Sequence, residues 1–162
     1  MLFDIIHLYL RGGSIIPYQN LESINIKNSY DLRQMPLEII ISPQSDTHTA
    51  KGTFIFDNDE KDDLKNEDYN RFELSFNNNV LTVTKKTTIK STYNFTDDII
   101  SKVKIFNAGY LINNNNNLII NKNDGNNENV AIQKSTTDNV ITVDLSTLNL
   151  KLSDIKNMTL SA

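Results

Sequence analysis

The acidic segment Asp57-Asn58-Asp59-Glu60-Lys61-Asp62-Asp63 has the ligand types that could bind calcium. Asp57 and Asp59 match the first alternate oxygen ligands of an EF-hand loop. Such a loop needs Gly at its sixth position and Glu at its twelfth, where this sequence has Asp62 and Asp68. The flanking residues are also typical of strands rather than helices. We therefore interpret the segment as a solvated turn and expect no metal ligand in it.

The two histidines, His7 and His48, are the candidates for a general base. Nucleophilic catalysis would need such a base beside Ser or Thr, with a third group to orient it. Neither histidine has a nucleophile motif such as Gly-x-Ser-x-Gly nearby. The sequence also has no cysteine, which excludes disulfides, thiolate metal sites and cysteine nucleophiles. We expect no catalytic residue and no cofactor in this chain.

The segment Arg11-Gly12-Gly13-Ser14 is superficially similar to a phosphate-binding loop. It lacks the Gly-x-Gly-x-x-Gly spacing, the Lys-Ser/Thr ending and the following helix that phosphate binding requires. Paired glycines do permit a turn with positive φ and a close approach of two backbones. The segment, followed by Ile15-Ile16-Pro17, therefore predicts a structural corner rather than a ligand site.

Asn94-Phe95-Thr96 and Asn157-Met158-Thr159 match the N-glycosylation sequon. Asn94 and Asn157 are accordingly the candidate modification sites. They favour a secreted or lysosomal protein, although a chain rich in Asn, Thr and Ser produces such motifs by chance.

Composition limits the partners of the chain. Sixteen basic and twenty acidic residues are interspersed, and no basic stripe with aromatic neighbours suggests a nucleic-acid partner. The apolar opening, residues 1–10, has no basic flank or cleavage site and is too short to span a bilayer, which needs about 20 apolar residues. We interpret it as a buried strand and expect no membrane span.

The elements that must position these residues are strands. Alternation is clear at Phe72, Leu74 and Phe76, which predicts one buried face and one solvated face. Asn77-Asn78-Asn79 then predicts a hairpin with a three-residue loop, because Asn tolerates positive φ. Further strands are predicted over residues 37–41, 52–56, 80–84, 103–106, 140–143 and 148–152. The fold class is therefore all-β.

Two antiparallel β-sandwich domains account for this pattern, one over residues 1–68 and one over residues 69–162, divided after the polar segment 57–68. Asparagine tracts at residues 113–117 and 121–129 are expected to form solvated loops, since they cannot bury apolar area.

Three motifs in residues 1–60 resemble glycoside hydrolase family 31 in order and spacing. The first motif of that family is an apolar strand followed by Arg-Gly-Gly or Arg-Ala-Gly and then Ile-Ile-Pro. The second is Arg-Gln-x-Pro-Leu, and the third is Ala-x-Gly-x-Leu-Phe-Trp-Asp-Asp-Gly-Glu. The matching segments here are Leu8–Pro17, Leu32–Glu38 and Ala50–Glu60. They are most similar to the acid α-glucosidase and maltase–isomaltase branch. Phe56 replaces the usual Trp, and Asn58-Asp59 replaces the Asp-Gly of the turn.

The resemblance implies the proximal and distal β domains that follow the catalytic (β/α)₈ barrel, with the barrel itself absent from this chain. Family members are retaining enzymes with two catalytic carboxylates. Both lie upstream on the barrel, the nucleophile in a Trp-x-Asp-Met-Asn-Glu type motif. This sequence has no Trp and no such motif. The resemblance therefore implies a structural region of an α-glucosidase, inactive alone, with the barrel as its partner and carbohydrate bound only through the parent enzyme.

Two other functions remain as hypotheses. A stand-alone carbohydrate-binding module would generally use exposed aromatic platforms, and here the aromatic fraction is 8% without tryptophan. A calcium-dependent interaction domain would use the acidic segment 57–63. Binding of maltodextrin, or stabilisation by calcium, would separate these from the structural role.

Overall fold

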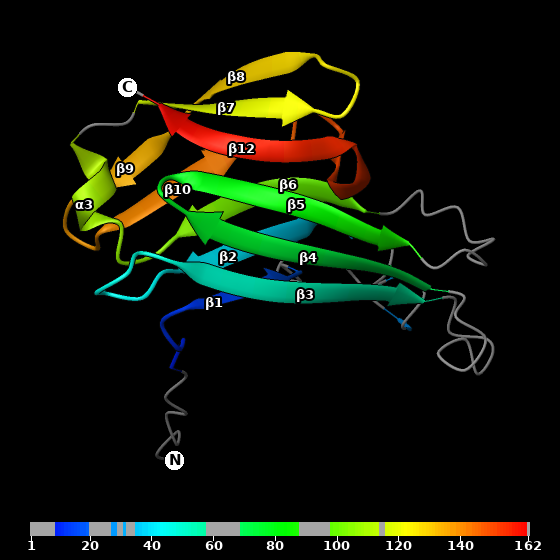
Figure 1. The fold of residues 1–162 in the computed structure, drawn as a ribbon, viewed down its shortest axis with the longest axis horizontal. Coiled ribbons are helices and arrows are strands. Elements are labelled where there is room, and N and C mark those ends of the chain that lie inside the picture. Colours follow the sequence, from blue (N-terminus) through cyan, green and yellow to red (C-terminus); the bar gives the residue numbers. More distant parts are fainter. Residues whose placement is uncertain are drawn as a thin grey trace.

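The computed structural model describes residues 9–19, 27–28, 31, 35–57, 69–87, 98–113 and 116–161. In this part of the chain the fold is almost entirely β (Figure 1), with a single-turn α3 (Gly109–Ile112) and a 3₁₀ turn, η1 (Leu152–Asp154). The strands are β1 (Ser14–Tyr18), β2 (Leu37–Ser42), β3 (Ala50–Asp57), β4 (Tyr69–Asn77), β5 (Val80–Thr87), β6 (Ile99–Ile105), β7 (Asn117–Lys122), β8 (Asn127–Ala131), β9 (Gln133–Ser135), β10 (Val140–Asp144), β11 (Leu150–Lys151) and β12 (Ile155–Ser161).

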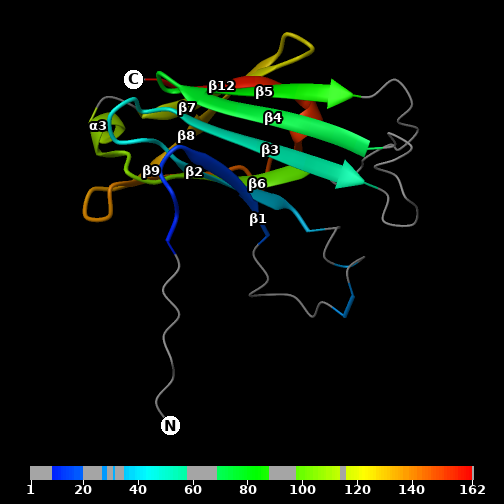
Figure 2. The ribbon, with the colours of Figure 1, turned by 60° about the horizontal axis from the view of Figure 1, so that its bottom comes forward.

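The strands form two facing layers that are joined at both sides. Their order is β8-β7-β12-β5-β4-β3-β1-β2-β6-β10-β9, with β11 paired to β6. Figure 2 shows β3, β4 and β5 in one layer, with β1, β2 and β6 in the other. At one side β1 joins β3 through a single register pair, Ser14 with Lys51. At the other side only Ile132 separates β8 from β9, so the chain passes directly between the layers. The result is a nearly closed β-sandwich, which confirms the predicted fold class.

Most of the ladders are antiparallel, as predicted for a sandwich. Two are parallel: β1 with β3, and β2 with β6. The β2–β6 pairing joins residues more than 60 positions apart in sequence and places Ile39 beside Val103. No periodicity in either strand encodes this direction, because parallel and antiparallel strands bury the same alternate residues.

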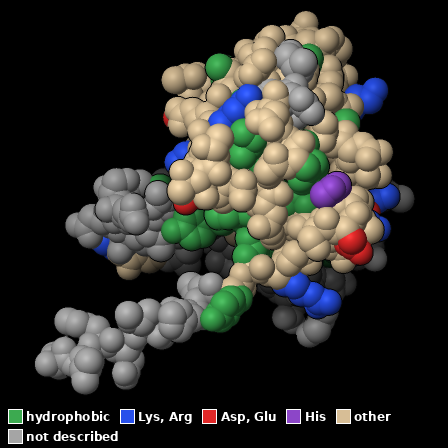
Figure 3. All heavy atoms as spheres, turned by 90° about the vertical axis from the view of Figure 1, so that its left-hand side faces the viewer, with side chains coloured by type: hydrophobic (Ala, Val, Ile, Leu, Met, Phe, Trp, Pro, Cys, Tyr) green, Lys and Arg blue, Asp and Glu red, His purple; other side chains and the backbone are tan. Residues whose placement is uncertain are grey.

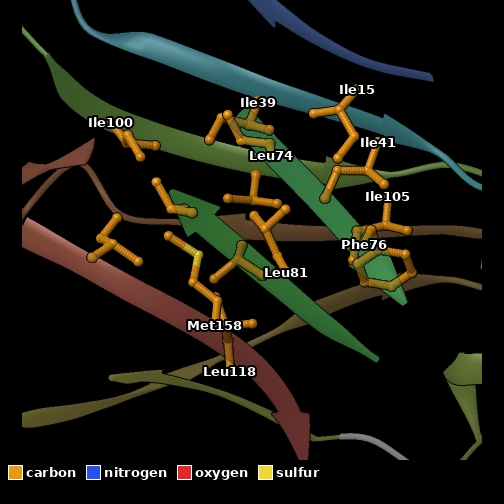
Figure 4. Close-up of a cluster of buried hydrophobic side chains, with 14 of the residues drawn as sticks. Ile15, Ile39, Ile41, Leu74, Phe76, Leu81, Ile100, Ile105, Leu118 and Met158 are labelled. Carbon is orange, nitrogen blue, oxygen red and sulfur yellow. The ribbon is translucent and has the colours of Figure 1, made fainter. Parts of the chain in front are cut away.

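One hydrophobic cluster fills the space between the layers. Ile39, Ile41, Ile100 and Ile105 from one layer face Phe72, Phe76, Leu81, Ile120 and Met158 from the other, and each of these side chains is buried. Figure 4 shows Ile39, Ile41, Ile100 and Ile105 converging with Phe76, Leu81 and Met158. The alternation predicted over residues 72–76 is confirmed, since Phe72, Leu74 and Phe76 all point into this core.

The β4–β5 hairpin differs from its prediction by one residue. Asn77 is the last residue of β4 and pairs with Val80, so the loop has two residues rather than three. Asn78 and Asn79 have φ values of 46° and 67°. Positive φ at both central positions is the requirement of a type I′ turn, whose twist matches that of the strands.

The asparagine-rich segment 121–129 is not a loop throughout, and that prediction is wrong. Residues 117–122 form β7 and residues 127–131 form β8, joined by a turn with Gly125 at a φ of 87°. The reason is that β7 begins before the tract with the aliphatic run Leu118-Ile119-Ile120, of which Leu118 and Ile120 are buried. The pairing of β8 with β7 then extends the sheet over the asparagine-rich residues.

The strand predicted over residues 148–152 is also shorter in the structure. Only Leu150–Lys151 forms a strand, and η1 begins at Leu152. Leu150 and Leu152 are nevertheless buried, with Leu148 packed against the core. The predicted alternate burial is therefore correct. It arises not from one continuous strand but from a turn, in which the Leu148 N–H donates to the Leu145 carbonyl, followed by β11 and η1.

The predicted domain boundary lies at the end of segment 58–68, which is outside the described residues. The strands on either side of that segment, β3 and β4, pair with each other over their whole length. The core cluster also takes residues from both sides of the boundary. The division at residue 68 stays a prediction.

Candidate functional site

Gly13 connects β1 to both neighbouring strands. Its N–H donates to the Ser42 carbonyl at 2.6 Å, and its own carbonyl accepts from the Lys51 N–H at 3.0 Å. Its φ is 87°, a conformation that favours glycine. The predicted structural corner is therefore present, and its hydrogen bonds go to backbone groups of β2 and β3.

Gly52 allows the close approach of β1 and β3. A Cβ atom at this position would overlap the Ile15 carbonyl oxygen and lie 2.9 Å from the Ile15 Cβ. The obstacle includes backbone, which cannot move aside as a flexible side chain can. The glycines at positions 13 and 52, from two separate motifs, thus belong to one structural junction between the layers.

The outer face of this junction carries exposed apolar side chains. Ile16 is 41% exposed, Tyr18 is 44% exposed and Ile55 of β3 is 52% exposed. We call these three residues the outer patch. They alternate with inward residues such as Ile15 and Phe54, so the strand period places them outside the core.

A buried carboxylate lies beside the outer patch. Glu38 of β2 pairs with Tyr18 of β1 and with Lys102 of β6, and only 3% of its surface is exposed. The ammonium groups of Lys102 and Lys104 each lie 3.1 Å from one of its two oxygens. Two cations therefore share one anion, an arrangement that offsets the cost of burying the carboxylate.

Asp98 is a second buried carboxylate with a structural role. Its side chain accepts from the Ser153 N–H at 2.8 Å, and its backbone carbonyl accepts from the Leu152 N–H at 2.8 Å. These bonds attach η1 to the start of β6. Both carboxylates are buried, with 3% of Glu38 and 0% of Asp98 exposed.

His48 packs against Tyr110. The residue has a φ of 54°, and its ring stacks on the Tyr110 ring with the centroids 3.8 Å apart. The Tyr110 hydroxyl is buried without a hydrogen-bond partner, and burial raises the pKa of this phenol to about 12. The structure thus gives His48 a packing contact that joins the β2–β3 turn to α3.

The structure describes one of the two candidate glycosylation sites. Asn94 lies outside the described residues. Asn157 is in β12 between β5 and β7, and its side-chain oxygen accepts from the Asn121 amide at 2.6 Å. The use of either site for glycosylation stays a prediction.

Several other predicted features lie wholly or partly outside the described residues. These are His7, the acidic segment after Asp57, and the opening strand up to residue 8. Tyr9 and Leu10, which close that predicted strand, are exposed and have no regular secondary structure, so the strand does not extend over them. Among the described residues no group of three His, Cys, Asp or Glu side chains could hold a metal ion. No helix in the same part of the chain has the length and apolar character to cross a bilayer.

The sequence analysis did not predict that Glu38 pairs with two lysines, although the residue pattern contained a sign of it. An acidic residue interrupts the aliphatic run at 37–41, and Lys102 and Lys104 alternate with apolar residues in a later strand. Only the parallel β2–β6 register brings the three together. The contact between His48 and Tyr110 had no sequence signal, because its two rings come from a turn and a one-turn helix.

Comparison with known proteins gives a consistent result. No protein-family model matches the sequence. Human intestinal sucrase-isomaltase is 26% identical over 152 residues, which cover 94% of this chain and 8% of the human protein.

Solved structures share the fold. The α subunit of glucosidase II, bound to α3-Glc2, matches with a TM-score of 0.75 and 14% identity, over 93% of this chain and 17% of that one. The Flavobacterium johnsoniae GH31 dextranase in complex with glucose matches with a TM-score of 0.54 and 14% identity, over 94% of this chain and 19% of the dextranase.

The chain therefore resembles glycoside hydrolase family 31 enzymes in sequence and in fold, as its three motifs predicted. It spans less than a fifth of the length of each of these proteins.

Proposed function

We propose that this chain is the C-terminal structural β region of an α-glucosidase-type glycoside hydrolase, in which a catalytic barrel on the same polypeptide hydrolyses terminal α-glucosidic bonds. One observation carries this proposal. The similarity to sucrase-isomaltase extends over 94% of this chain yet accounts for only 8% of the human protein. The chain is thus equivalent to one small part of a much larger hydrolase.

The environment of the buried acids supports a non-catalytic role. A retaining glycosidase needs two carboxyl groups about 5 Å apart that flank the sugar. Glu38 is instead closed in by two lysines, and Asp98 accepts a backbone hydrogen bond of η1. Both groups stabilise strands, so we expect the isolated chain to be inactive.

The sequons at Asn94 and Asn157 support a route through the secretory pathway, with a secreted or lysosomal destination. An N-linked glycan on the native protein, detected by a mass shift after glycosidase treatment, would support this part of the proposal.

The test compares the native polypeptide with the isolated chain. Antibodies raised against residues 1–162 should capture a polypeptide several times larger than 18.5 kDa that hydrolyses p-nitrophenyl α-glucoside. The purified 162-residue chain should not hydrolyse this substrate. Capture of a native polypeptide without α-glucosidase activity would overturn the proposal, as would hydrolysis by the isolated chain.

A further inference from the structure

We infer that the free edge of β8 pairs in the antiparallel direction with the same edge of a second copy of this chain, so that one sheet continues through a two-fold symmetric dimer. The inference goes beyond the proposed function, because it concerns self-association and involves no reaction. Three features support it: the direction of the backbone groups of β8, the lack of protection along its edge and the charges around it.

The backbone of β8 has hydrogen-bonding groups that point away from its neighbour. Among the described strands β8 stands at one end of the order and pairs with β7 alone (Figure 1). The Lys122 N–H donates to the Asn126 carbonyl at 2.9 Å, and the Ile132 N–H donates to the Asn116 carbonyl at 3.1 Å. Because bonded and non-bonded pairs alternate along an antiparallel ladder, the odd-numbered residues between them direct their backbone groups outward. We call these groups the β8 edge, and they belong to the exposed residues Asn127, Asn129 and Ala131.

The β8 edge lacks the features that usually keep an edge strand from pairing with another chain, such as proline, a bulge or an outward lysine. β8 has no proline, and its register with β7 is continuous. Its single charged residue, Glu128, pairs with Lys122 of β7. At the other end of the strand order, β9 has only three residues and includes Lys134. Of these two terminal strands, β8 is therefore the one that is open to pairing.

The surface beside the β8 edge is uncharged. On the outer faces of β8, of β7 and of β12 after its bulge, the side chains are those of Asn127, Asn129, Ala131, Asn117, Ile119, Asn121, Asn157, Thr159 and Ser161. The outer face of β4, by contrast, has Arg71 and Glu73. Figure 3 shows mostly uncharged polar side chains and backbone in the upper half of the molecule, the half in which Figure 1 places β7 and β8. Two copies can therefore meet here without bringing like charges together.

The charges at the two ends of β8 favour the antiparallel direction. Asp124 lies in the turn before β8, and Lys134 lies in β9 directly after it. An antiparallel pair brings Asp124 of each copy towards Lys134 of the other, whereas a parallel pair would bring the two Asp124 turns together. Asp144 ends β10, which approaches β8, and there the second copy contributes the uncharged Asn127.

The outward backbone groups also fix a register. With Asn129 at the centre, Asn129 of one copy lies opposite Asn129 of the second copy, and Asn127 lies opposite Ala131. Each of these pairs exchanges two backbone hydrogen bonds. Glu128 then lies opposite Val130, so no like charges face each other. Because both copies use the same residues, the contact closes on itself as a two-fold dimer.

Mass and amide hydrogen exchange test the dimer. The captured native polypeptide should sediment as a dimer, and the purified chain should change from 18.5 kDa to about twice that mass as its concentration rises. Amide exchange at Asn127, Asn129 and Ala131 should slow by about tenfold or more in the dimer, because these N–H groups become bonded. Ile120, which lies between β12 and β8 in both states, is the internal control and should not change.

Variants at Asn129 separate the backbone from the side chain. Asn129→Pro removes an N–H that points away from β7, where an edge strand tolerates proline. It should weaken dimerisation about tenfold or more, because each dimer loses two backbone hydrogen bonds. Asn129→Lys places like charges opposite each other and should also weaken dimerisation about tenfold or more. Asn129→Ala keeps the backbone groups, and Thr84→Lys adds the same charge to the exposed face of β5, so both should leave the dimerisation constant unchanged.

Each other outcome counts against the dimer. A chain that stays at 18.5 kDa at every concentration would overturn the inference, as would a native polypeptide that sediments as a monomer. A dimer that neither Asn129→Pro nor Asn129→Lys weakens would show that another surface pairs. Growth beyond the dimer would contradict the two-fold closure. These results leave the proposed function untouched, since that depends on the α-glucosidase activity of the native polypeptide.

Discussion

Gly52 shows how a single residue type can decide whether two layers of a sandwich join. The Ile15 carbonyl occupies the space in which any other side chain would begin. Gly12, forty residues earlier, lies in the same corner as Gly13, but a Cβ there would meet only ordinary contacts at 3.5 Å or more. The two positions are therefore suited to a matched comparison.

We predict that Gly52→Ala lowers the free energy of unfolding by about 3 kcal/mol, since overpacking against rigid backbone forces the strands apart. Gly12→Ala should change it by less than about 0.5 kcal/mol, as substitutions away from such constraints usually do. Urea denaturation of the two variants measures both values. Similar free energies of unfolding for the two variants would show that the close approach of β1 and β3 does not contribute to stability.

Tyr110 gives a prediction about alkaline pH. Its folded-state pKa of about 12 lies above the ordinary value near 10, so the folded state holds the phenolic proton more tightly than the unfolded chain does. This contribution is fully present below pH 10 and is lost as pH rises towards 12. Stability should therefore fall over that interval.

Tyr110→Phe should remove this part of the pH dependence and preserve the stacking on His48. It should not destabilise the protein at neutral pH, because the buried hydroxyl that it deletes has no hydrogen-bond partner. Tyr110→Ala, by contrast, should cost about 3 kcal/mol through lost ring packing. Thermal melts from pH 7 to pH 11 compare the three proteins, and an unchanged alkaline slope in the Phe variant would contradict the assignment.

At the scale of elements, one ion-pair group bridges the parallel strands β2 and β6. Glu38→Gln removes the anion that Lys102 and Lys104 share. We expect the free energy of unfolding to fall by about 3 kcal/mol, at the lower end for a broken buried pair because both lysines reach solvent and Asp144 remains beside Lys102.

Glu73→Gln is the matched control. Glu73 pairs with Arg71 at 3.0 Å on the exposed face of β4. Such surface pairs contribute little, so the change should be below about 1 kcal/mol. Chemical denaturation of both variants provides the comparison, and equal effects would mean that burial of Glu38 does not strengthen its pairing.

At the scale of the whole molecule, the shared core makes a prediction about cooperativity. Residues from both sides of the predicted boundary at 68 contribute to one cluster, and β3 pairs with β4 across it. We therefore expect one unfolding transition, with equal calorimetric and van't Hoff enthalpies. Two resolved transitions would instead support two domains divided at residue 68.

The residue patterns were sufficient to predict the all-β class, six of the twelve strands in the described part of the chain and the glycine corner, whereas β1, β7, β8, β9 and β12 were not predicted. Alternation of apolar residues depends on local backbone geometry, which the order of amino acids encodes directly. Two predictions were partly in error. At residues 148–152 the predicted burial was right but the continuous strand was not, and at residues 121–129 the asparagine content concealed the end of β7 and the start of β8.

Tertiary structure alone decided which strands distant in the sequence became neighbours, and with them the candidate site. The β2–β6 and β1–β3 ladders are parallel and non-local, so their register depends on packing between distant segments rather than on any local pattern. That register brings Glu38 to its two lysines and leaves Ile16, Tyr18 and Ile55 exposed. The sequence by itself determined which side chains are apolar and on which strand face they lie, because strand periodicity is local, and the fold determined which of them became buried, because burial depends on contacts between distant segments.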